Sequence, residues 1–111
     1  MAYTTRLTWE QLRSINSATL TGSFQPVGGP LLYESYIFKM VNNSTSLVTV
    51  SWDGVNAYDV LPAGSFFLYD CDTSGIPTPE GFPAGTQIFV SGSAGTGLIY
   101  VVSVYVVQTI S

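Results

Sequence analysis

The residues of this chain that could do acid–base chemistry are a few carboxylates in one polar stretch. Asp70, Asp72 and Glu80 could in principle form the paired acids of a glycosidase. Carboxylates two residues apart in a polar loop are more often solvated turn formers. The chain has no histidine, so the usual general base, the usual zinc ligand and the Ser-His or Cys-His nucleophile pair are all missing. The sequence therefore predicts a protein that is not an enzyme, with no catalytic residue.

Cation binding has only a few oxygen ligands to draw on. Asp53, Asp59, Asp70 and Asp72 lie in or beside expected loops, and calcium is the ion that such oxygen ligands suit. They lack the dense alternating spacing of a calcium loop, and Asp53 is explained by a turn with Gly54. We predict no metal and no cofactor.

Two further features could suggest chemistry. The single cysteine, Cys71, stands between two carboxylates with no activating cation nearby, so an inert thiol is expected. Glycines at 92, 95 and 97 resemble a phosphate-binding loop, but no helix and no lysine follow them. We interpret residues 93–97 as a hairpin loop.

Aromatic residues offer the one alternative binding site. Exposed aromatic rings in β-domains can stack on sugars, and Tyr58 and Tyr69, beside the irregular stretch 71–81, are the candidate glycan-binding residues. Aromatic residues at alternating strand positions are more often core or interface. A carbohydrate-binding module is therefore the alternative interpretation.

The charge content is the most unusual property of the composition. Only 9% of the residues are charged, against about a quarter in an ordinary soluble domain. Seven acidic and three basic residues give a net charge of -4, which disfavours direct contact with nucleic acid or an anionic membrane. So uncharged an exterior is expected where other copies or partners cover much of it, and this indicates an assembly subunit.

The first nineteen residues are expected to form an arm. Thr8 and Gln11 have the spacing of a capping box, and Trp9, Leu12 and Ile15 would share one face of a short helix ending near Asn16. A helix of barely two turns must dock on something to persist. The predicted interface residues of this arm are Tyr3, Leu7, Trp9, Leu12 and Ile15.

From residue 20 to residue 111 the pattern is that of a β-domain. Apolar and β-branched runs alternate with turn residues, which places strands near 20–26, 35–41, 46–52, 56–60, 65–70, 86–92 and 97–108. We predict an all-β antiparallel sandwich, jelly-roll-like, of seven to eight strands. The expected core is Phe24, Ile37, Phe38, Val48, Val50, Trp52, Leu68, Ile88, Val90, Tyr100, Val102 and Val104.

Several segments carry a resemblance to a known class of protein. They are the stretch from Val41 to Gly54, Leu61-Pro62-Ala63-Gly64-Ser65-Phe66 with Tyr69-Asp70, Pro83-Ala84-Gly85-Thr86-Gln87-Ile88, and the closing strand from Gly97 to Tyr105. In these segments the chain resembles the small β-sandwich virion proteins of tailed bacteriophages. The likeness extends over residues 20–108 and is one of pattern, without a catalytic motif.

The resemblance implies a structural protein of the virion, made in the host cytoplasm. The expected role is a capsid decoration or cement protein, with a neck or tail component as the alternative. Its partners would be copies of itself, as a trimer or a ring, and other virion proteins such as the major capsid protein.

Overall fold

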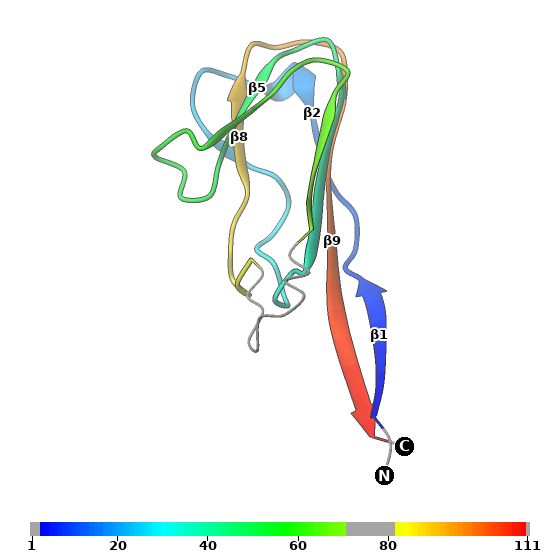
Figure 1. The fold of residues 1–111 in the computed structure, drawn as a ribbon. Coiled ribbons are helices and arrows are strands. Elements are labelled where there is room, and N and C mark those ends of the chain that lie inside the picture. The colour runs from blue at the N-terminus through cyan, green and yellow to red at the C-terminus, as the bar shows by residue number, and fades with distance from the viewer. Residues whose placement is uncertain (1–2, 71–81, 111) are drawn as a thin grey trace.

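The protein is an elongated β-sandwich in which one two-stranded ribbon extends beyond the body (Figure 1). The structure, a computed structural model, describes the backbone of residues 3–70 and 82–110 and the side chains of residues 7–69 and 82–107. The predicted loop 71–81, with Cys71, Asp72 and Glu80, lies outside the described residues.

In the described residues nine strands form two antiparallel sheets, here called sheet A and sheet B. Sheet A has the order β1-β9-β4-β7, with β2 also paired to β9. Its strands are β1 (Tyr3–Trp9), β2 (Arg13–Asn16), β4 (Ile37–Ser44), β7 (Phe66–Asp70) and β9 (Gly97–Ile110). Sheet B has the order β3-β8-β5-β6. Its strands are β3 (Gln25–Pro26), β5 (Val48–Ser51), β6 (Asp59–Leu61) and β8 (Phe89–Gly92).

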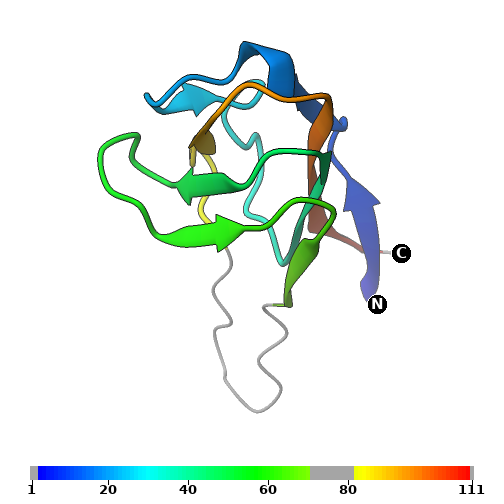
Figure 2. The same cartoon turned by 90° about the horizontal axis from the view of Figure 1, so that it is seen from above.

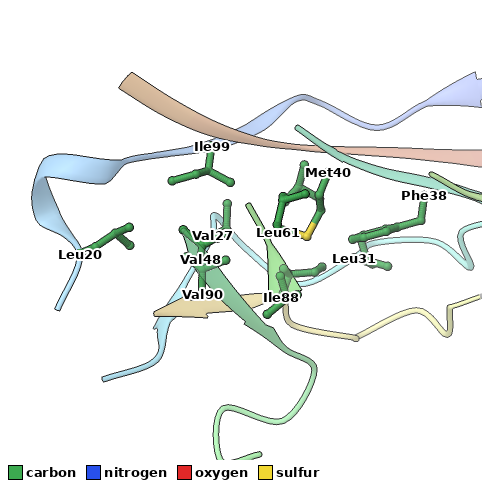
Figure 3. Close-up of a cluster of buried hydrophobic side chains, with 12 residues drawn as sticks. Leu20, Val27, Leu31, Phe38, Met40, Val48, Leu61, Ile88, Val90 and Ile99 are labelled. Carbon is green, nitrogen blue, oxygen red and sulfur yellow. The ribbon is translucent and has the colours of Figure 1, made fainter. Parts of the chain in front are cut away.

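The predicted all-β class and two-sheet architecture are confirmed, and the expected strands from residue 20 onward correspond to β3 to β9. The core lies between the inner faces of the sheets and contains Phe38, Met40, Val48, Ile88 and Ile99 (Figure 3). An aromatic group closes one end, where Phe38 lies 4.7 Å from Phe82 and 5.6 Å from Trp52 between ring centroids.

The predicted N-terminal helix is wrong. Tyr3–Trp9 and Arg13–Asn16 are strands that pair with β9, and the only helical turn in the described residues is the 3₁₀ turn η1 (Ser17–Thr19). Two turns of helix could not hold themselves together, whereas β9 offers a seven-residue ladder to β1. The threonines of this segment also favour a strand, because β-branched residues suit a pleated surface.

Two predicted turns take a different form. The predicted turn of Asp53 with Gly54 is part of a wider loop, because β5 ends at Ser51 and β6 begins at Asp59. Only Gly54 in it has a positive φ, of 77°. Residues 93–97 join β8 of sheet B to β9 of sheet A, so they cross between the sheets and do not form a hairpin.

The Pro-Ala-Gly segments, in contrast, form the pair of similar turns that the sequence indicates. The Ser65 amide donates to the Pro62 carbonyl, and the Thr86 amide donates to the Pro83 carbonyl, both at 3.2 Å. The glycines between them have φ of 72° and 90°, which an L side chain rarely adopts.

The ribbon of β1 and the end of β9 makes the molecule long. The principal extents are 54 × 23 × 21 Å, and the radius of gyration is 15.4 Å. A compact chain of this length would have a radius of gyration of about 13 Å. Seen from above, β1 and β9 lie on the opposite side of the molecule from the loop between β5 and β6 (Figure 2).

Candidate functional site

The outer face of sheet A is the most apolar surface of the protein. We call it the apolar face and define it by the exposed and half-buried apolar side chains that the strand register places on it: Leu7, Trp9, Ile37, Val41, Phe66, Leu68, Leu98, Tyr100, Val102 and Val106. The register also places there the polar residues Ser14, Asn16 and Asn43, and Val104, which is buried. Single exposed apolar residues are ordinary on proteins, but a contiguous set is typical of an interaction surface.

Paired positions across the strands make this set continuous. Val41 of β4 is paired with Phe66 of β7 on one side and with Tyr100 of β9 on the other. In the next row, Lys39 stands between Leu68 and Val102. Because paired residues point to the same side of a sheet, each row presents its side chains together.

The exposure of these residues confirms that nothing in the described part of the chain covers them. Trp9 is 62% exposed, Phe66 66%, Leu68 53% and Leu7 49%. The other six members are half-buried between their neighbours. Lys39 carries the only charge among the described side chains on this face, and it makes no ion pair with any described residue.

The ribbon continues the apolar face beyond the sandwich. Leu7 is paired with Val106, and Trp9 with Val104, on the face that Val102 belongs to. The pairing of β4 with β9 ends at Val104, so beyond that residue β9 has β1 as its only partner strand among the described residues. A two-stranded ribbon has two open edges and is marginally stable alone in water.

A buried ion pair fastens the base of the ribbon to the body. Glu10, which follows β1, and Arg13, the first residue of β2, lie 2.9 Å apart, with side chains 2% and 10% exposed. Arg13 donates from Nε to the Gly29 carbonyl and from Nη2 to the Pro30 carbonyl, each at 2.8 Å. Glu10 accepts the Leu32 amide at 3.0 Å. The loop before β4 is thereby held against the connection from β1 to β2.

This ion pair should make stability depend on acid pH. Burial by itself raises the pKa of Glu10, but hydrogen bonds from the Leu32 and Tyr33 amides and the Arg13 guanidinium outweigh it and hold the pKa below its usual value. The stabilisation is then present above the unfolded-state pKa and is lost as the pH falls through the lower folded-state pKa.

We therefore expect Glu10→Gln to lower the free energy of unfolding at pH 7 by about 1.5–3 kcal/mol, measured by urea denaturation. The difference between the variant and the original protein should shrink as the pH falls below about 4.3, the ordinary glutamate pKa, because the unfolded chain then takes up a proton more readily than the folded one. A deficit that stays constant down to pH 2–3 would show that the charge of Glu10 is not what stabilises this junction.

The predicted interface residues are brought to different places. Leu7 and Trp9 lie on the apolar face, and Leu12, 56% exposed, lies in the connection between β1 and β2. Ile15 is partly buried and packs against the core. Tyr3 is paired with Ile110 near the ribbon tip, and its side chain lies outside the described part. Sequence reasoning missed Phe66, Leu68 and Val41 as members of the face.

The two tyrosines of the predicted glycan site have partners within the chain. The Tyr58 hydroxyl donates to Asp53 at 2.7 Å, which raises the pKa of Tyr58, and its ring is exposed. The Tyr69 ring packs 4.8 Å from Phe67 between centroids, and its hydroxyl donates to Asp59. Burial, followed by this hydrogen bond, raises the pKa of Tyr69 to about 12. Glycan binding by these residues stays a prediction.

Asp53 organises the loop between β5 and β6. One carboxylate oxygen accepts the Val55 amide at 2.8 Å and the Asn56 amide at 2.9 Å, and these bonds hold the pKa of Asp53 well below its usual range. Among the described residues, no group of three or more acidic or cysteine side chains lies close enough to hold a metal ion.

Comparisons with known protein families, with curated proteins and with solved structures found no match to this chain. The described residues also contain no helix that is long and apolar enough to span a membrane.

The hollows of the surface differ in chemistry from the apolar face. An open depression of about 820 Å³ lies over sheet B and the adjoining turns, and its lining is uncharged and rich in hydroxyl groups. Thr21, Thr49 and Ser91 are among its lining residues. A hydroxyl-rich depression thus lies over part of sheet B, whose outer side also carries the exposed Val60, whereas the apolar face lies on the outer side of sheet A.

Proposed function

We propose that this chain is a non-enzymatic structural subunit of a bacteriophage particle, a capsid decoration or cement protein that stabilises the head through symmetric assembly. The observation that carries the proposal is the apolar face. It leaves large apolar side chains in water on a domain that has few charges to keep it soluble. Covering that face in an assembly removes the unfavourable contact with water.

We also propose that the sandwich is a jelly roll. The sheets β2-β9-β4-β7 and β3-β8-β5-β6 each interleave strands from both halves of the chain, and the chain passes repeatedly between them. Jelly rolls are an architecture of viral capsid domains and also of lectins. Because one fold serves both, the choice between them rests on the surface, and the apolar face favours assembly.

The energy available from this surface suits a structural role. Four exposed side chains, Leu7, Trp9, Phe66 and Leu68, leave roughly 500 Å² of mainly apolar surface in water, at about 150–250 Å² for a whole large side chain. Burying it yields about 12 kcal/mol gross at 25 cal/mol per Å². Association costs offset much of this for one contact, and repeated contacts in a symmetric particle add to one another.

Incorporation into particles tests the function. We expect the tagged chain to sediment with particles when it is expressed in a host where they assemble, and Phe66→Asp to reduce that incorporation by tenfold or more, since a charge in an apolar contact costs about 1.4 kcal/mol or more. Val55→Asp is the matched control, because Val55 is 77% exposed in the loop between β5 and β6.

Absence of the tagged chain from purified heads, necks and tails alike would contradict the proposal. Sedimentation with neck or tail structures and not with heads would assign the alternative position on the particle.

A further inference from the structure

We propose that the apolar face is a self-complementary interface, on which a second copy of this chain docks with its own apolar face across a two-fold axis. The inference rests on the proposed function and names a second copy of this chain as the first partner to bind the apolar face. It commits to a two-fold contact, whereas the assembly proposed above would also be satisfied by a ring or by a different virion protein.

The area of the face matches what a stable dimer needs. The four exposed side chains contribute roughly 500 Å², and the six half-buried ones bring the total toward the roughly 800 Å² per partner of a standard interface.

The chemistry of the face selects the occupant. The face has ten apolar side chains and one cation, with the uncharged Ser14, Asn16 and Asn43 at the end where β2 pairs with β9, so a partner must present a largely apolar surface of similar size with few charges. The hydroxyl-rich depression over sheet B, which Thr49 and Ser91 help to line, does not offer this. The apolar face of another copy does, and a two-fold axis brings the same surface of both copies together.

Lys39 makes the prediction specific. Its aliphatic stem can lie along Leu68 and Val102 while its ammonium reaches the rim, yet two copies meeting through this face bring two like charges into one interface. Lys39→Met should therefore tighten self-association, by about threefold or more. A partner that presented a carboxylate to Lys39 would be bound more weakly by the same variant.

Trp9, in the ribbon, is a fluorescent reporter of this contact. Trp9 is exposed on the apolar face, whereas Trp52, the other tryptophan, packs against the core. We expect light scattering to give twice the chain mass and Trp9 emission to shift to shorter wavelength as the concentration rises from about 1 µM to about 100 µM. In Trp9→Phe the concentration-dependent shift should be absent, because Trp52 is already enclosed.

Phe66→Asp and Leu68→Glu should each weaken the dimer by about 30-fold or more, while Val55→Asp should leave it unchanged. Both face residues are exposed in the monomer, so the thermal unfolding of the dilute variants should match that of the original chain.

A monomer at every concentration, or a dimer insensitive to Phe66→Asp, would overturn the two-fold interface. Trimers or larger rings that bury Trp9 would overturn it as well and leave the assembly function standing. A Phe66-dependent dimer that never enters particles would support the interface and remove the proposed function.

Discussion

Replacing Asn42 with alanine should lower the free energy of unfolding by about 3–5 kcal/mol, the largest single-residue effect we expect in this chain. Asn42 is fully buried on the inner face of β4. Its Nδ2 donates to the carbonyls of Ser46 at 2.7 Å, Leu61 at 3.0 Å and Pro62 at 3.2 Å. Its Oδ1 accepts the hydroxyl of Ser44.

The large effect follows from what the amide leaves behind. Alanine removes the donor shared by three carbonyls at the place where the chain passes from β4 to β5 and from β6 to β7. The Pro62 carbonyl keeps the Ser65 amide as a donor, so the carbonyls that lose most are those of Ser46 and Leu61. A buried carbonyl without a partner costs about 1–3 kcal/mol, and the lost side chain adds a cavity.

Urea denaturation followed by tryptophan fluorescence measures this change, with Asn43→Ala as the control. Asn43 is the next residue of β4 and is exposed on the outer side, so its replacement should change stability by no more than about 0.5 kcal/mol. Equal effects of the two replacements would show that the buried amide is not a structural centre.

The sequence did not reveal this role of Asn42. The run Asn42-Asn43-Ser44 predicts a polar turn, because such residues compete with the backbone for hydrogen bonds and favour turns. In the structure β4 continues through Ser44, and alternate residues of the run point inward and outward. The pattern of polar residues cannot show which asparagine is buried, because burial of its side chain depends on backbone carbonyls that are distant in the sequence.

Alternation predicted the inner face reliably where one side of a strand is polar. Val48 and Val50 are buried as expected, because Thr49 separates them and marks the outward side. In β9 both sides are apolar, and the expected assignment of Tyr100 and Val102 to the core is wrong. Both lie half-buried on the outer face, and Ile99 and Val101 occupy the core in their place.

The same ambiguity left part of the apolar face unpredicted. Residues 66–69 of β7 are all apolar or aromatic, so no polar neighbour indicated that Leu68 faces outward, and it was predicted to belong to the core. Leu68 is 53% exposed. A strand that is apolar on both sides is itself a signal of an outer contact, and β7 and β9 share that signal in the sequence. Which strands lie side by side requires the sheet order.

Leu7 and Trp9 were predicted as contact residues from a helix that does not form. Both side chains are exposed in the strand, and their role as contact residues stays a prediction. The strand places them two residues apart on one face, beside Val106 and Val104 of β9. The local capping signals at Thr8 and Gln11 are outweighed by strand pairing with β9, the last strand in the sequence.

Replacing Gly97 with alanine should destabilise the fold by about 3 kcal/mol, because the new methyl group meets the backbone in a conformation that already disfavours it. Gly97 begins β9 with a φ of 102°. A Cβ there would lie 2.1 Å from the Asn43 carbonyl oxygen and 2.9 Å from the Ser44 Cα. Those atoms belong to β4, so relief requires the central pairing of sheet A to open.

Gly64→Ala separates the two causes. Gly64 also has a positive φ, of 72°, but no atom lies within 4 Å of a Cβ built there. It should therefore show the conformational cost alone, about 1 kcal/mol. Calorimetric melting gives the loss of stability in each variant. The additional loss in Gly97→Ala measures how closely β4 approaches the start of β9. If the two glycines proved equally replaceable, the close approach of β4 to the start of β9 would be wrong, and with it the register that aligns the apolar face.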